Sequence, residues 1–412
     1  MKTLPGKKTA ANTITVVGLF LFSIGAFNLP GQIFFALTLS YFIWKSKVIV
    51  FQKQELALLL FSASYFIIYT FHFGFAVKSI IIYLWGPWAA FLFGKWFVVS
   101  ERDAHAFQVL TGTLTFGFFL HSALNLLAYL RSEYYAQYAY QRVAVDFWRG
   151  DMVSVISTGL MLTFAVAMST SMLFSPCGFR EKIIALALLL ACIFEASFFA
   201  YRTMIFIIFA LIVFNLLRWL CDASVQIKGK TVLIVLIILL LAAVFTFFFL
   251  NAFGSRDALL SLKIVRRLLY DNKSSRFRTW GEYLSSGDWL RYPFGGQKSE
   301  FAYHGQWVHN LWLDILNKVG LIPFVIAAGF TVTSIRSACC TAVRMKRLHY
   351  SRLSNQIASL SLGAMLICMP EPVIDANPYF FFAILMLLGG IKGLECLSCV
   401  NDRTISGQKG DF

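Results

Sequence analysis

Charged residues are scarce in this sequence. Asp, Glu, Lys and Arg make up only 14% of its 412 positions, whereas 58% of the positions are hydrophobic and 43 of them are Phe. A soluble globular domain carries about 25% charged residues, which cover the surface that faces water. The shortage of charge excludes an ordinary soluble domain and predicts a membrane protein.

A cleavage site is also missing near the start of the chain. Lys2, Lys7 and Lys8 lead into a full-length apolar stretch, and no small-residue cleavage site accompanies it. A secretory signal peptide needs a short apolar region followed by such a site. We therefore expect the first apolar helix to stay attached.

Long apolar runs recur from one end of the chain to the other. A helix needs about 20 apolar residues to cross the roughly 30 Å hydrocarbon core of a bilayer. Twelve stretches are candidates: 11–29, 31–44, 55–73, 76–98, 107–130, 152–174, 182–200, 202–221, 231–251, 310–335, 354–370 and 378–396. The sequence predicts an all-α polytopic membrane protein with about 12 transmembrane helices. Helices 1–9 lie in residues 1–251, one large loop occupies 252–308, and helices 10–12 with a tail occupy 309–412.

Basic residues fall into alternate connections between these candidate helices. If the N-terminus is cytoplasmic, every inner connection carries Lys or Arg, for example Lys95, Arg180 and Arg344. Short basic loops stay on the cytoplasmic side of a membrane. This pattern places both termini in the cytoplasm and the 252–308 loop outside. It also accounts for most of the net charge of +16, so we expect no nucleic-acid partner.

Cysteine is absent from the segments that this topology places outside. All eight cysteines fall within candidate spans or on the inner side, so no disulfide is predicted. Cys396 and Cys399 have the spacing of a metal or redox pair, but no His partners lie nearby in the sequence. We therefore expect no metal site.

The 252–308 loop is basic, with nine Lys or Arg residues against five acids. Residues 257–270 have an apolar stripe typical of an amphipathic helix on a membrane surface. Arg276 and Arg278 follow within Ser-Ser-Arg-Phe-Arg-Thr-Trp. A guanidinium group presents a planar fork of donors that fits phosphate oxygens, so both arginines are candidates for binding a phosphate group.

Two other polar residues lie where the outer loops meet the membrane. His309 precedes the tenth span, and an imidazole there is able to accept a proton near neutral pH. Arg202 lies between the seventh and eighth spans, where an arginine is either a snorkelling anchor or a functional cation. Glu195, about two helical turns away, is a possible partner of Arg202. On the tenth span, Asp314 and Lys318 have the spacing of an intrahelical ion pair.

These residues fall in a pattern that resembles the O-antigen ligase and polymerase superfamily. His309-Asn310, nine residues and Gly320 are similar to its His-Asn-x9-Gly signature. Arg276-x-x-x-Trp280, followed by Pro293-Phe294-Gly295-Gly296, resembles its Arg-x3-Trp and glycine-rich turn. Arg202 matches its span-end arginine. Pro323 departs from the ligase pattern, in which Gly, Thr or Tyr follows the glycine by three.

The resemblance implies a GT-C-like bacterial inner-membrane glycosyltransferase without a cofactor or obligatory metal. Its donor would be a glycan on undecaprenyl diphosphate, and its acceptor lipid A-core or another lipid-linked glycan. Catalysis would take place on the periplasmic face, within reach of membrane lipids. An O-antigen ligase of lipopolysaccharide biosynthesis is our first hypothesis, because one dominant loop separates helices 9 and 10. A polymerase is the alternative, since Pro323 and Leu313-Asp314 favour it.

The expected roles follow from the chemistry of a departing diphosphate. Cations against the leaving group stabilise its developing charge, so Arg202 and Arg276 are the candidate catalytic cations and His309 is the candidate base. A carboxylate base also stays open, with Glu300, Glu371 and Asp375 as outer carboxylates, although we rank these three as supporting partners. The candidate substrate-binding residues are Arg278, Asn310, Trp280, Gly295, Gly296 and Glu371.

Two further hypotheses remain open. A lipid-linked oligosaccharide flippase or transporter would also use membrane arginines, but it would not need the long outer loop. The smaller outer loop, 131–151, interleaves aromatic and basic residues, among them Trp148 and Arg149. This pattern suits either a sugar-stacking surface or the ordinary aromatic belt of a membrane protein, and the belt is the more common structure.

Overall fold

The computed structural model describes residues 8–45, 52–133, 143–221, 275–296 and 308–407. The elements of the first half are α1 (Lys8–Ser23), η1 (Ala26–Asn28), α2 (Pro30–Lys45), α3 (Lys53–Phe73), α4 (Val77–Ser79), η2 (Ile80–Trp85), α5 (Gly86–Glu101), α6 (Ala104–Arg131), α8 (Val155–Leu173), α9 (Phe179–Phe198) and α10 (Arg202–Leu220). The later ones are α14 (Ser275–Ser286), α15 (Asp288–Arg291), α17 (Leu311–Val319), α18 (Leu321–Arg347), α19 (Ser351–Cys368), α20 (Val373–Ala376) and α21 (Pro378–Gly407).

The chain is an all-α membrane protein in its architecture. Within the described ranges, seven helical stretches are long and apolar enough to cross a bilayer: Lys53–Phe73, Val77–Glu101, Ala104–Arg131, Val155–Leu173, Arg202–Leu220, Leu321–Arg347 and Pro378–Ser398. Large apolar side chains project outward from these helices, and Phe71 is 85% exposed. Such a surface is stable against lipid and costly against water.

The predicted count of twelve spans stays a prediction. The candidate span 231–251 and the candidate amphipathic helix 257–270 lie outside the described residues. α1 and α2 are apolar helices of 16 residues each. The candidate span 31–44 corresponds to α2, and the candidate span 182–200 corresponds to α9.

One predicted span is divided in two. The stretch 310–335 consists of the nine-residue α17 and the start of α18, and the chain bends between them at Gly320. Gly320 has φ +83° and ψ −166°, which is a conformation that only glycine adopts readily. His309 and Asn310 therefore begin a short separate helix instead of the spanning helix itself.

The smaller loop contains the one sheet that the described residues form. β1 (Val143–Val145) pairs antiparallel with β2 (Met152–Ser154), with Ala144 opposite Val153. The hairpin loop folds back onto the bundle, where the Trp148 ring packs 4.9 Å from that of Phe27 and its indole N–H donates to the Ile24 carbonyl at 3.1 Å. Trp148 thus packs on the bundle, and the two hypotheses for this loop stay predictions.

The centre of the bundle is the contact between α5 and α21. A Cβ added at Gly94 would lie 2.0 Å from the Met386 carbonyl oxygen, and one added at Gly389 would lie 2.0 Å from that of Phe91. Small residues let membrane helices approach backbone to backbone. Around this pair, α6, α8, α18 and α19 enclose a core of aromatic and aliphatic side chains.

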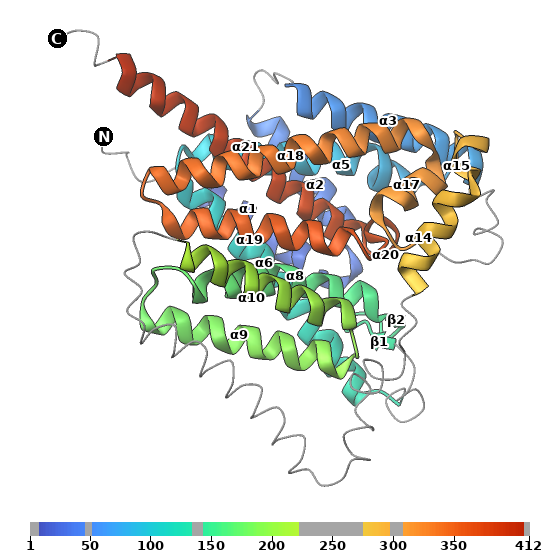
Figure 1. The fold of residues 1–412 in the computed structure, drawn as a ribbon, viewed down its shortest axis with the longest axis horizontal. Coiled ribbons are helices and arrows are strands. Elements are labelled where there is room, and N and C mark those ends of the chain that lie inside the picture. Colours follow the sequence, from blue (N-terminus) through green and yellow to red (C-terminus); the bar gives the residue numbers. More distant parts are fainter. Residues whose placement is uncertain (1–7, 46–51, 134–142, 222–274, 297–307, 408–412) are drawn as a thin grey trace.

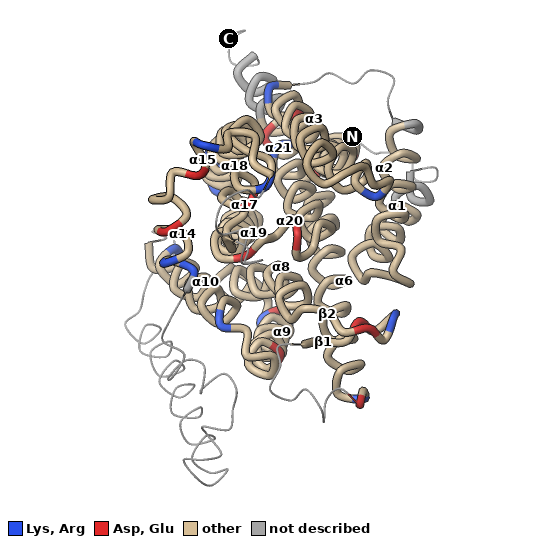
Figure 2. Tube along the Cα trace, turned by 90° about the vertical axis from the view of Figure 1, so that its right-hand side faces the viewer, with Lys and Arg blue, Asp and Glu red and all other residues tan. Residues whose placement is uncertain are grey.

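Short polar elements gather at one end of the bundle, which we call the site end. Figure 1 shows α14, α15, α17 and α20 there, together with the hairpin, while the long helices extend toward the other end. Figure 2, which looks along the helices, shows a mostly tan tube whose coloured positions include α14, α15 and α9. The fold therefore brings the polar segments of the sequence together at the ends of apolar helices.

Candidate functional site

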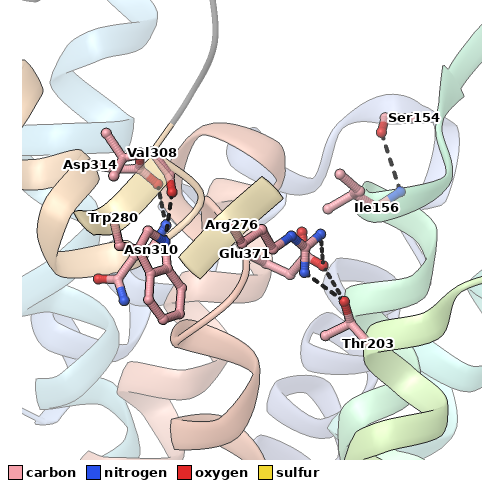
Figure 3. Close-up of polar contacts among 9 residues, drawn as sticks. All are labelled: Ser154, Ile156, Thr203, Arg276, Trp280, Val308, Asn310, Asp314 and Glu371. Carbon is pink, nitrogen blue, oxygen red and sulfur yellow. Dashed lines mark hydrogen bonds and ion pairs between the residues drawn. The ribbon is translucent and has the colours of Figure 1, made fainter. Parts of the chain in front are cut away.

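A three-residue polar cluster joins segments that are far apart in the sequence. The Arg276 guanidinium donates to the Glu371 carboxylate and to the Thr203 hydroxyl, each at 2.8 Å, and Thr203 donates to the same Glu371 oxygen at 2.7 Å. These side chains come from α14, from the turn before α20 and from the first turn of α10 (Figure 3). Glu371 is fully buried, whereas the Arg276 side chain is 23% exposed.

Only one face of α14 takes part in this site. Arg276 and Trp280 are four residues apart, so they lie on the same side of the helix. Arg278 lies on another side, is 79% exposed, and pairs with Glu282 at 2.5 Å. The structure therefore brings Arg276 and Trp280 together with the predicted site residues and leaves Arg278 on the outer surface.

Trp280 ties α14 to the residues before α17. Its indole N–H donates to the Val308 carbonyl at 2.8 Å. Tyr283, Val308 and Leu316 form a small buried cluster beneath this bond. Because Val308 precedes His309, α14 links the Arg276 cluster to the candidate base.

His309 and Asn310 form the start of α17. The Asn310 side chain accepts hydrogen bonds from the backbone N–H groups of Trp312 and Leu313, both at 3.1 Å. This is the geometry of a helix N-cap. His309 is half-buried and has φ +57°, an uncommon left-handed conformation for a residue other than glycine. Asn310 thus has a structural role in shaping the turn that carries His309.

The glycine-rich turn packs against the break between α17 and α18. The Leu321 N–H donates to the Pro293 carbonyl at 2.7 Å, and the Gly296 N–H donates to the Lys318 carbonyl at 3.0 Å. A Cβ at Gly295 would meet the Gly320 nitrogen at 2.7 Å. Gly295 and Gly296 therefore permit a close backbone contact with Gly320, which explains why the two glycine motifs of the sequence occur together.

Arg202 begins α10 and is half-buried. Its chain neighbour Thr203 belongs to the Arg276 cluster, so Arg202 and His309 both lie at the site end. Glu195, the partner that the sequence suggested, is buried and accepts a hydrogen bond from the Ser122 hydroxyl.

The predicted pair between Asp314 and Lys318 is wrong. Lys318 forms its ion pair with Asp375 of α20, and its ammonium lies 5.2 Å from the ring centroid of Tyr69 and 5.8 Å from that of Tyr83. Asp314 instead accepts a hydrogen bond from the Asn310 N–H at 3.1 Å. The helical spacing allowed an intrahelical pair, but the fold brings the Asp375 carboxylate of α20 into contact with the Lys318 ammonium.

An apolar slot extends into the bundle from the site end. The slot has a cavity volume of about 60 Å³ and lies between α3, α17, α18, α19 and α21. Its lining runs along α18 from Ala327 to Ala338, a distance of about 16 Å at 1.5 Å per residue. Leu311 and Cys368 lie at its outer end, next to Asn310 and three residues before Glu371. Two residues of its lining are thus close in sequence to Asn310 and Glu371.

Thr203 is the member of the cluster that the sequence did not reveal. A threonine at the start of an apolar span is unremarkable in sequence, and its partners lie 73 and 168 positions away. Within the described ranges, no group of three or more His, Cys, Asp or Glu residues is arranged to hold a metal ion.

Comparisons with known proteins do not assign the chain to a family. No family model matches it, and no curated protein matches it either.

Proposed function

We propose that this protein is a membrane glycosyltransferase that takes a glycan from an undecaprenyl-diphosphate donor. The observation that carries the proposal is the convergence of Arg276, Trp280, the His309 turn and Glu371 at one end of the bundle. An apolar slot whose lining includes Leu311 and Cys368 supports it. A lipid diphosphate is both apolar and strongly anionic. A cation next to an apolar slot suits both parts of such a molecule.

Arg276 is our candidate for the catalytic cation. A guanidinium has five N–H donors, and the two contacts described above use one donor each on Nη1 and Nη2. The buried Glu371 carboxylate and the Thr203 hydroxyl fix its direction. We therefore assign Glu371 to holding Arg276 and not to direct contact with the substrate. A cation held in this way stabilises a leaving diphosphate without reorganising during the reaction.

His309 is our candidate base, and Arg202 our candidate second cation. In this scheme the His309 imidazole accepts the proton of the acceptor hydroxyl as the oxygen attacks the anomeric carbon. The bond from that carbon to the diphosphate oxygen breaks at the same time, which gives inversion in a single displacement. Arg278 remains a candidate for a peripheral contact with the donor, because it is exposed on α14.

The proposed setting is a bacterial inner membrane. We propose about 12 spans, with residues 231–251 as the ninth, both termini in the cytoplasm and the site end in the periplasm. The basic residues at the other end of the helices support this orientation, since Lys53, Lys95 and Arg344 all lie there. Lipid A-core is the proposed acceptor of an O-antigen ligase.

A polymerase that joins lipid-linked repeat units is the alternative. Pro323 supports it, and the structure has a place for this residue in the first turn of α18, where a missing N–H breaks no helical hydrogen bond. A flippase for the same lipid-linked glycan is the more remote alternative.

A gel of lipopolysaccharide and an analysis of the lipid-linked glycan pool test this proposal. The experiment uses a deletion strain that carries the wild-type gene, Arg276→Ala, His309→Ala or the exposed control Arg291→Ala, with protein levels checked. A ligase predicts that the first two variants lose all capped bands while long lipid-linked chains accumulate. Core with a single repeat would indicate a polymerase. Unchanged bands from well-expressed Arg276→Ala and His309→Ala would contradict the site assignment.

A further inference from the structure

The Asp314 carboxylate accepts hydrogen bonds from backbone N–H groups on both sides of His309. It accepts the N–H of Asn310 at 3.1 Å and also that of Val308, and Figure 3 shows the three residues together. His309 lies between these two N–H groups in the left-handed conformation described above. A carboxylate that accepts the N–H groups of the residues before and after His309 restricts the turn and therefore the direction of the imidazole.

Charged and titratable groups surround Asp314 on every side. Lys318 lies one turn further along α17, and Asp375 approaches from α20, where it pairs with Lys318. Tyr65 of α3 and Tyr283 of α14 also lie within electrostatic range, while Tyr83 of η2 faces Asp375. Among the described residues, the cluster thus has two carboxylates and one ammonium.

This environment moves the titration of Asp314 into the neutral range. Burial, followed by the negative charge of Asp375, raises the pKa of Asp314 to about 8, although the N–H groups of Asn310 and Val308 and the Lys318 charge act in the opposite direction. Asp314 therefore changes from protonated to ionised within a pH range that suits experiments on the protein. Ionised, it accepts both N–H bonds strongly, and the protonated form accepts them more weakly.

We propose that Asp314 is a positioning residue for His309. The Asp314 carboxylate fixes the turn when it is ionised, and binding of a proton to this carboxylate loosens the turn. The catalytic part of this inference rests on the proposed function, because it states that ionised Asp314 places His309 better as a base at higher pH. The geometric part concerns the mobility of the His309 turn and does not depend on any reaction.

The first test measures the turn without measuring activity. Purified full-length protein in nanodiscs is treated with diethylpyrocarbonate, and modification of His309 is followed by mass spectrometry from pH 6.5 to 9.5, with each rate corrected for imidazole ionisation. In the wild type we expect the corrected rate to fall by about threefold as Asp314 ionises and the turn tightens. Asp314→Asn keeps an acceptor but cannot ionise, so its corrected rate should not change with pH.

A matched control comes from the hairpin loop. Asp146 also accepts two backbone N–H groups, those of Trp148 and Arg149, each at 2.9 Å, but it lies away from His309. Asp146→Asn should leave the wild-type profile unchanged. A pH-independent corrected rate in the wild type, or a wild-type profile in Asp314→Asn, would overturn the proposal.

Glycan transfer provides the second readout. The wild-type rate should rise in two steps with pH, one from the imidazole and one near pH 8, and Asp314→Asn should retain only the first step. If no transfer occurs in any sample, the proposed function fails, but the modification profile still decides whether Asp314 controls the turn. If transfer occurs and Asp314→Asn keeps the second step, the positioning role is wrong and the proposed function survives.

Discussion

Two buried ion pairs at opposite ends of the bundle differ in how fully they are enclosed. Lys95 and Glu55 join α5 to α3, and their side chains are only 5% and 0% exposed. Arg276 and Glu371 include an equally buried carboxylate, but the arginine side chain is 23% exposed. The first pair is closed to ligands, whereas the second presents a fixed cation at the surface of the site.

The difference separates a pair that serves the fold from a pair available for chemistry. In a closed pair the mutual contact offsets part of the desolvation cost of both charges, and removing one partner leaves a buried charge. A half-open pair retains donors that a ligand can use. Membrane proteins place ionisable groups within their helices only at a cost, so the open pair is the better indicator of function.

The largest expected effect comes from breaking the closed pair. Lys95→Met removes the partner of a buried carboxylate and should lower the stability by about 3–5 kcal/mol. The double variant Lys95→Met with Glu55→Met should recover most of this loss. Thermal unfolding in detergent checks both changes. A single variant as stable as the wild type would mean that Glu55 and Lys95 do not form the closed pair.

A smaller effect is expected at the glycine contact that supports the open pair. Gly320→Ala puts a Cβ 2.1 Å from the Pro293 carbonyl oxygen, at a residue with φ +83°, and should cost at least about 1–3 kcal/mol. The matched control is Gly329→Ala within α18, where the added Cβ meets nothing within 4 Å. The two melting temperatures are compared in the same detergent. Equal losses would mean that the turn at Pro293 does not pack on Gly320.

The hydroxyl that joins the open pair provides a third comparison. Thr203→Val removes the group that bonds to both Arg276 and Glu371, and should cost about 1–3 kcal/mol because it leaves buried polar atoms with fewer partners. Thr163→Val is the control, because the buried Thr163 hydroxyl bonds to no described group. Thermal unfolding should separate the two variants. Equal losses of stability in Thr163→Val and Thr203→Val would mean that the bonds of the Thr203 hydroxyl to Arg276 and Glu371 do not stabilise the protein.

Sequence reasoning predicted the helical membrane architecture but not the contacts between distant segments. Composition and apolar run length are local properties, and they predicted the spanning helices such as α3 and α8. The break at Gly320 also had a local signal that the span prediction overlooked: glycine commonly ends a helix and proline is common at the start of one, and Pro323 follows Gly320 by three residues.

Pairing depends on the tertiary fold, and spacing along one helix was misleading there. Lys318 had a carboxylate four residues away, yet it pairs with Asp375, 57 positions further along the chain. Arg276 and Glu371 were both candidates from residue type, whereas their contact with each other and the part played by Thr203 became evident only when the helices were packed together. Long-range contacts of this kind leave no periodic pattern in the sequence.

Transfer by the purified protein tests the central claim most directly. The full chain in nanodiscs receives an undecaprenyl-diphosphate-linked glycan and either lipid A-core or a second lipid-linked glycan, and the released diphosphate and the lengthened product are quantified. The account predicts transfer by the wild type and a loss of at least about 10²-fold in Arg276→Ala, as expected when a group that stabilises transition-state charge is removed. Lys95→Arg, which keeps the closed pair charged, should retain activity. Equal transfer by wild type and a correctly folded Arg276→Ala variant would contradict the account.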